Sequence, residues 1–200
     1  IINNNGSGLE TSLNFNNSTL NNVTINSNKY RGIDGLTNAT LDNCEISYNE
    51  FGGLKDLYNV TIQNSVISHN TILRGDGGSS GAGIYGMTSP MSLTNVLIEH
   101  NKTIDGYGGG ISLSLLTDDM ILENVTIRNN YALRGGGIYQ GSTDDFVELS
   151  SSNKCNVYSN YALFGTDFYW ENPANGTTTI VVDTFTVANS TSYYAYTKSG

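Results

Sequence analysis

Basic residues are scarce in this chain, and their scarcity excludes several classes of protein. The 200 residues include 9 Lys and Arg against 18 Asp and Glu, which gives a formal charge of −9. Binding to nucleic acid needs clustered basic residues, and so does attraction to an anionic membrane surface. We therefore expect neither a nucleic-acid partner nor a membrane-surface partner.

Long hydrophobic runs are also missing from the sequence. No stretch of about 18 apolar residues occurs, so we expect no membrane span in this segment. The sequence opens with IINNNG, without an initiating Met or a signal peptide. We expect it to be a fragment of a longer protein.

Helical periodicity is missing as well, and a repeat of asparagine stands in its place. The segments 15–28, 36–49 and 57–70 overlay without a gap, and their asparagines recur every 21 residues, as at Asn22, Asn43 and Asn64. A fixed period of this size indicates one structural unit stacked on copies of itself. Later copies end at Asn101, Asn130 and Asn160 and are 31, 29 and 30 residues long. They add a glycine motif that reads GAGIY, GGGIS, GGGIY and GTDFY, beginning at Gly81, Gly108, Gly135 and Gly165.

Within each unit the hydrophobic period is two, which is typical of short strands. The pattern predicts an all-β protein, a right-handed parallel β-helix solenoid of about seven to eight coils with strands roughly 4.8 Å apart. Coils are expected over residues 1–170, with 21-residue units to about residue 71 and units of roughly 30 residues after it. Residues 171–200 are expected to form an irregular C-terminal cap. Stacked corner asparagines can bond to one another along the axis. The interior is expected to hold one column of Val23, Cys44, Ser65, Val96, Val125 and Cys155 and a second of Ile25, Ile46, Ile67, Ile98, Ile127 and Val157.

The two cysteines occupy the same predicted inward column. Cys44 and Cys155 would lie about four rungs, or roughly 19 Å, apart, whereas a disulfide needs Cα atoms within about 7 Å. We therefore expect two free, buried thiols.

The motif Asn130-Tyr-Ala followed by Gly135-Gly-Gly-Ile-Tyr resembles the repeats of polymorphic outer-membrane proteins, which pair GGA[ILV] with FxxN. Here Gly replaces Ala, and Ile127 replaces Phe. The likeness covers roughly residues 20–169. It extends to adhesin-like surface proteins and to the wider pectate-lyase-like β-helix group. The resemblance implies a β-helix fold and an exported, cell-surface context.

Insertions between the strands are the expected place for function, because a regular solenoid presents it on loops. The insertions cover residues 72–80, 86–92, 102–107, 112–119 and 140–146, and we expect those at 72–80, 112–119 and 140–146 to share one ligand-facing edge. Two of them end in acidic pairs. Their carboxylates suit either a Ca²⁺ site or acid and base catalysis of sugar hydrolysis. Alternatively, the aspartates occur there only because Asp favours turns. These carboxylates belong to Asp118, Asp119, Asp144 and Asp145. No other cofactor is expected.

Four further residues are predicted to face a ligand from these loops. Arg74 and Asp76 belong to an RGD tripeptide, Asp105 lies in the insertion at 102–107, and Arg134 precedes a glycine motif. Tyr48, His69, His100 and Asn129 share a column that either stacks on itself or binds a sugar face. Ten Asn-x-Ser/Thr sequences also occur, most of them by-products of the coil corners.

These features favour a non-catalytic, adhesin-like surface module that binds a glycan or a host or surface protein, with self-association through the solenoid ends as a further partner mode. A polysaccharide lyase or glycoside hydrolase is the enzymatic alternative, and a carbohydrate-binding module is a third. The chain has four Arg and no Arg-x-Lys, and its acidic surface repels uronates. No set of nucleophile, base and orienting group can be assembled, so no catalytic residue is predicted.

Overall fold

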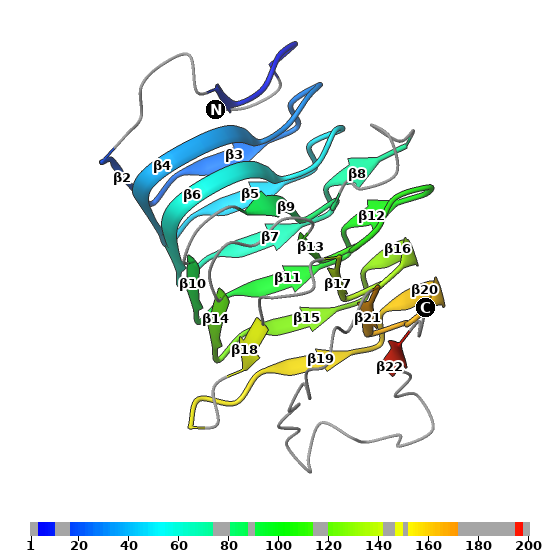
Figure 1. Cartoon of the computed structure of the whole chain (residues 1–200). Coiled ribbons are helices and arrows are strands. Elements are labelled where there is room, and N and C mark those ends of the chain that lie inside the picture. The colour runs from blue at the N-terminus through cyan, green and yellow to red at the C-terminus, as the bar shows by residue number, and fades with distance from the viewer. Residues whose placement is uncertain are drawn as a thin grey trace.

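The chain folds into three parallel sheets that wrap around one axis. The computed structural model describes residues 4–10, 17–73, 81–87, 91–113, 120–141, 147–149, 152–171 and 195–197. The strands stack as rungs, with the N-terminus at one end of the stack and the C-terminus near the other (Figure 1). No helix that could cross a membrane occurs over these residues.

A six-stranded sheet carries one rung from each unit. Its pairings are all parallel, and its register joins equivalent positions of successive units, so the predicted stacking is confirmed. The strands are β3 (Thr24–Asn26), β5 (Glu45–Ser47), β7 (Val66–Ser68), β11 (Leu97–Glu99), β15 (Thr126–Arg128) and β19 (Asn156–Tyr158).

A four-stranded sheet follows the six-stranded sheet along each later coil. It is also parallel throughout. Its strands are β8 (Thr71–Ile72), β12 (Lys102–Thr103), β16 (Tyr131–Arg134) and β20 (Tyr161–Phe164).

A twelve-stranded sheet closes the coil and branches at its two long strands, β4 (paired with β1 and β2) and β6. The first part of β6 pairs with β9 and its last part with β10, so later coils have two short strands where earlier coils have one long strand. The strands are β1 (Leu9–Glu10), β2 (Thr19–Asn21), β4 (Ile33–Asp42), β6 (Leu54–Gln63), β9 (Ile84–Met87), β10 (Met91–Thr94), β13 (Ile111–Leu113), β14 (Met120–Glu123), β17 (Ile138–Gln140), β18 (Val147–Leu149), β21 (Phe168–Trp170) and β22 (Ala195–Thr197).

This branching shows which strands the insertions follow along the chain. Residues 88–90, 114–119 and 142–146 follow the strands β9, β13 and β17, whereas residues 74–80 come before β9. A strand therefore separates residues 74–80 from the other three segments along the chain; all four segments lie outside the described residues, so a shared loop edge stays a prediction.

The predicted core columns are confirmed. Ile25, Ile46, Ile67, Ile98 and Ile127 pair in sequence across the six-stranded sheet and are buried. Both cysteines are free and buried, as predicted from the register.

Buried asparagines form a continuous ladder at the corner between the six-stranded and four-stranded sheets. The Nδ2 of Asn49 donates to Oδ1 of Asn70 at 2.8 Å, and that oxygen also accepts the Asn49 backbone N–H. The Nδ2 of Asn49 donates a second bond to the carbonyl of Ile25, so the amide is fully used although it is buried. The same contacts recur along the corner, which confirms the predicted ladder; its members are Asn28, Asn49, Asn70, Asn101, Asn130 and Asn160.

Asp167 ends this ladder. Its Oδ1 accepts from the backbone N–H of Asn160 at 3.2 Å and from Nδ2 at 2.9 Å, as the next asparagine would. Earlier coils carry glycine at this position, because a Cβ on Gly137 would lie 2.9 Å from the Nδ2 of Asn160. Burial raises the pKa of the Asp167 carboxyl, although the bonds from Asn160 oppose the shift. Asp167 thus replaces both the glycine and the missing rung.

Exposed corners use the left-handed backbone conformation. Asn43, Asn64 and Asn95 have φ between 50° and 56°, as expected for asparagine. A second corner puts Tyr48 and His69 at φ 56°, a strained value for these side chains that the register of every coil imposes.

Candidate functional site

The outer surface of the four-stranded sheet collects exposed apolar side chains. Among the described residues, six of the eleven exposed large hydrophobic side chains lie on this sheet or on the corner that follows it. Large exposed apolar patches mark interaction sites on soluble proteins. We name this surface the apolar face and define it by Leu73, Ile104, Tyr131, Tyr161, Leu163 and Phe164.

Strand alternation produces most of the apolar face; Phe164, two residues after the inward Ala162, is exposed without it. Ala132 and Ala162 point inward and are buried, so the residues on either side of them point outward. The rings of Tyr131 and Tyr161 stack with centroids 5.3 Å apart and planes 13° from parallel. The Nζ of Lys102 lies 5.3 Å from the centre of the Tyr131 ring, which is cation–π range. A cation and two phenol rings are therefore aligned along the axis.

The other outer faces carry more polar side chains, although Tyr58 and Ile121 are exposed on the twelve-stranded sheet. On the six-stranded sheet, Arg128 forms an ion pair with Glu99 at 2.8 Å and donates to the hydroxyl of Tyr158. On the second half of the twelve-stranded sheet, Thr40 and Thr61 pair in register and are partly exposed. Over the described residues, the largest group of exposed apolar side chains therefore lies on the four-stranded sheet and the corner after it.

Two of the predicted ligand-facing residues border the apolar face. Asp105 is exposed in the turn that follows β12. Arg134 is half-buried, and its guanidinium carbon lies 5.0 Å from the centre of the Tyr107 ring and 5.5 Å from that of Tyr169. It also pairs with the carboxylate of Glu171 at 3.0 Å. Asp105 is open to a ligand, whereas Arg134 is held by protein groups.

Glu171 links Arg134 to a buried phenol. The other carboxylate oxygen of Glu171 accepts a hydrogen bond from the hydroxyl of Tyr139, whose ring is stacked 5.7 Å from that of Tyr169. Burial, followed by the bond to Glu171, raises the pKa of Tyr139 far above its ordinary value. The phenol stays protonated and donates, so this cluster ties residue 171 to the coils.

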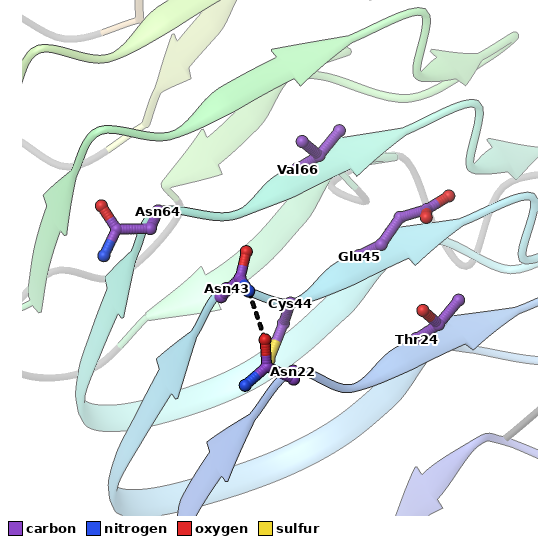
Figure 2. Close-up of a pocket in the computed structure, with 7 residues that line it drawn as sticks. All are labelled: Asn22, Thr24, Asn43, Cys44, Glu45, Asn64 and Val66. Atoms are coloured by element: carbon purple, nitrogen blue, oxygen red, sulfur yellow. Dashed lines mark hydrogen bonds between the residues drawn. The ribbon is translucent and has the colours of Figure 1, made fainter.

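A hollow of about 390 Å³ lies along the corner that precedes the six-stranded sheet. Figure 2 shows Asn22, Asn43 and Asn64 at this corner, with outward side chains from β3, β5 and β7 beside them. Asn43 donates to the Oδ1 of Asn22. Burial raises the pKa of the Cys44 thiol at the base of the hollow, so this thiol is a poor nucleophile. The remaining lining residues are Thr24, Glu45 and Val66.

The same corner forms a second hollow of about 400 Å³ further along the axis. Its lining includes Asn95, Asn124 and Thr126, which occupy the positions of the first hollow in later coils. Repetition shows that these hollows are a property of the coil shape. Their amides and hydroxyls can bind polar groups, but they contain no paired acid and base.

The predicted cation site cannot be placed. Asp118, Asp119, Asp144 and Asp145 lie outside the described residues, as do Arg74 and Asp76. Within the described part of the chain, no group of three or more His, Cys, Asp or Glu side chains converges as a metal site would.

The predicted aromatic column is confirmed as a self-stack. The rings of Tyr48 and His69 lie 4.7 Å apart, and those of His69 and His100 lie 4.9 Å apart. Each ring therefore uses its face against a neighbour.

Sequence reasoning missed Tyr131 and Tyr161 as candidate binding residues. Each directly follows a ladder asparagine, Asn130 or Asn160, and this position points outward in every later coil. Following that single position along the repeat would have identified them.

Comparisons with known proteins give one match. A family model described as a right handed beta helix region matches residues 33–199. No curated protein matches the chain, and no solved structure does.

Proposed function

This chain belongs to the right-handed β-helix family, and we propose that it is a non-catalytic, adhesin-like binding module of an exported or cell-surface protein. The proposal rests mainly on the apolar face. Tyr161 is 64% exposed and Leu163 is 69% exposed, although the chain buries its other columns of apolar side chains efficiently. Such side chains gain most from a partner that removes them from water.

A glycan is the ligand that fits this face. Sugar rings present apolar C–H surfaces, which pack on aromatic and aliphatic side chains, and hydroxyls, which need polar partners at the edge. Tyr131 and Tyr161 supply ring surface together with hydroxyls. Lys102 and Asp105 supply a cation and a carboxylate beside them. The overall charge of −9 disfavours an acidic polysaccharide, so the proposed ligand is a neutral glycan.

The lyase or hydrolase alternative would need an acid and a base near a ligand. The described cluster that comes nearest is Tyr139, Arg134 and Glu171, in which Tyr139 and Arg134 each bond to the carboxylate of Glu171. A protonated phenol cannot abstract a proton. The guanidinium of Arg134 already lies against the rings of Tyr107 and Tyr169. These contacts support a tie between coils in preference to a catalytic centre.

The test is a glycan array and isothermal titration with the purified chain and two matched variants. We expect binding of a neutral glycan that falls at least tenfold in Tyr161→Ala and is unchanged in Tyr58→Ala. Tyr58 is 47% exposed on the twelve-stranded sheet and therefore controls for loss of a tyrosine. Equal loss in both variants would contradict the proposed face, and binding to proteins but to no glycan would contradict the proposed ligand.

The non-catalytic part of the proposal has a separate test. Polysaccharides are incubated with the chain, and new reducing ends and unsaturated products are measured. Turnover above that of a heat-denatured sample would refute it and would favour the lyase or hydrolase alternative.

A further inference from the structure

Several coil corners place an Asn-x-Ser/Thr sequence at the surface in one recurring geometry. The asparagine is exposed and left-handed, and the third residue of the sequence starts or continues a strand with its side chain outward. At Asn38, for example, φ is 51°, Ala39 is buried and Thr40 is partly exposed. The corner asparagines with this sequence and a positive φ are Asn17, Asn22, Asn38, Asn59 and Asn124.

Asn101 has the same sequence motif in the opposite environment. It is a ladder residue with no exposed surface, its Oδ1 accepts two bonds from Asn70, and its Nδ2 donates to Ile67 and Asn130. A sugar on this nitrogen would have to lie inside the solenoid. The fold thus divides identical sequence motifs into accessible and inaccessible asparagines.

We propose that the exposed corner asparagines are acceptor sites for N-linked glycans. The donor is a lipid-pyrophosphate-linked oligosaccharide, the co-substrate of the transferase in an export pathway. In the transfer, Nδ2 bonds to the anomeric carbon, the bond from that carbon to the pyrophosphate oxygen breaks, and one amide proton is released. Acceptor asparagines in this sequence lie in surface turns of exported proteins; these corners are surface turns, and their export rests on the proposed function.

The contacts of the corners are compatible with the modification. Asn124 donates from Nδ2 to the Oδ1 of Asn95 at 2.7 Å, and a glycosylated amide keeps one N–H for that bond. Asn59 donates in the same way to Asn38. Both contacts are exposed, so attached sugars extend into solvent.

The acceptor corners also lie away from the apolar face. They border the six-stranded sheet and the middle of the long rungs of the twelve-stranded sheet. The ladder beside the apolar face contains one such motif, at Asn101, and that residue is buried. Glycans on these five corners would therefore extend from the faces of the six-stranded and twelve-stranded sheets and leave the apolar face open; the exposed Asn5, which also carries the motif, is not one of these corners.

The test is secretion of the whole chain from a eukaryotic cell, followed by site-resolved mass spectrometry of the folded, secreted protein. Enzymatic removal of glycans in heavy-oxygen water marks each occupied asparagine. We expect occupancy at Asn38, Asn59 and Asn124 to exceed that at Asn101 by at least tenfold. Thr126→Val should abolish occupancy at Asn124 and leave occupancy at Asn38 unchanged, because it removes the motif at one partly exposed position and keeps a β-branched side chain.

Two results would overturn the proposal. One is a secreted chain whose corner asparagines are all unmodified. The other is occupancy at Asn101 within tenfold of the corners in protein that retains the far-UV circular dichroism of a β fold. Neither outcome depends on whether the apolar face binds a glycan.

Discussion

Replacing Asn101 with Ala removes one rung of the buried ladder, and its cost follows from the contacts of that side chain. The Oδ1 of Asn101 accepts from the backbone N–H and the Nδ2 of Asn70, at 3.1 and 3.0 Å. Its Nδ2 donates to the carbonyl of Ile67 at 2.9 Å and to Asn130 at 3.1 Å. Four bonds at about 0.5–1.5 kcal/mol each give a loss of about 2–6 kcal/mol. We expect a loss of unfolding free energy in the upper half of this range, because the former hydrogen-bond partners of Asn101 are buried and stay unpaired.

The matched control is Asn95→Gly at an exposed corner. Asn95 also takes part in two amide bonds along the axis, with Asn64 and Asn124, and its φ is 56°. Glycine accepts this conformation, and water can replace the lost bonds. We therefore expect a loss of about 1 kcal/mol or less for this variant.

Urea unfolding measures both variants, with far-UV circular dichroism and tyrosine fluorescence as separate probes. Stacked repeats can unfold in steps, so a free energy is taken only where the two transitions coincide and the urea dependence is unchanged. Equal losses for Asn101→Ala and Asn95→Gly would refute the reasoning. They would show that the buried ladder bonds contribute no more to stability than the exposed corner bonds.

Three further predictions concern the core and the last rung. Ile98→Asp should abolish folding, because it buries a carboxylate without a partner, whereas Leu97→Asp on the partly exposed side of the same strand should fold; circular dichroism separates these outcomes. Mass spectrometry of the unreduced, alkylated and denatured protein should show two free thiols, and a crosslink between Cys44 and Cys155 would overturn the register. Asp167→Asn should increase stability at pH 7. The folded protein binds the Asp167 proton more tightly than the unfolded chain does, so wild-type stability falls as pH rises from the unfolded pKa, about 3.9, through the raised folded pKa. Chemical unfolding of both proteins at pH 3 and pH 7 tests this prediction. A wild type with a higher free energy of unfolding than the variant at pH 7 would contradict it.

The register of the coils could be predicted from the sequence because the first units overlay without a gap. A column of five isoleucines and a row of asparagines cannot keep their spacing unless the units stack in parallel. The ladder was predictable for the same reason, since each asparagine meets its own copy on the next rung.

The position of the loops could not be predicted from the repeat alone. Which insertions share an edge depends on where the long strand divides, and that division begins in pairing between β6 and both β9 and β10. The contacts of Arg134 were also hidden, because Tyr107 comes from the preceding coil and Tyr169 and Glu171 come from the following one. Contacts of this kind depend on side-chain reach across rungs, which spacing does not encode.

The hydrogen bonds of the asparagine ladder all run in one direction, so coils can be added to the solenoid on one side of the ladder's end only. Each side chain donates toward the C-terminal side and accepts from the N-terminal side, so every rung is complementary to a copy of itself. A further 21-residue unit can therefore be inserted between Asn49 and Asn70, which lengthens the rod by about 4.8 Å. The inserted asparagine would make the same hydrogen bonds as its neighbours in the ladder. The carboxylate of Asp167 has no amide with which to continue the series, so length can be added before this residue and not after it.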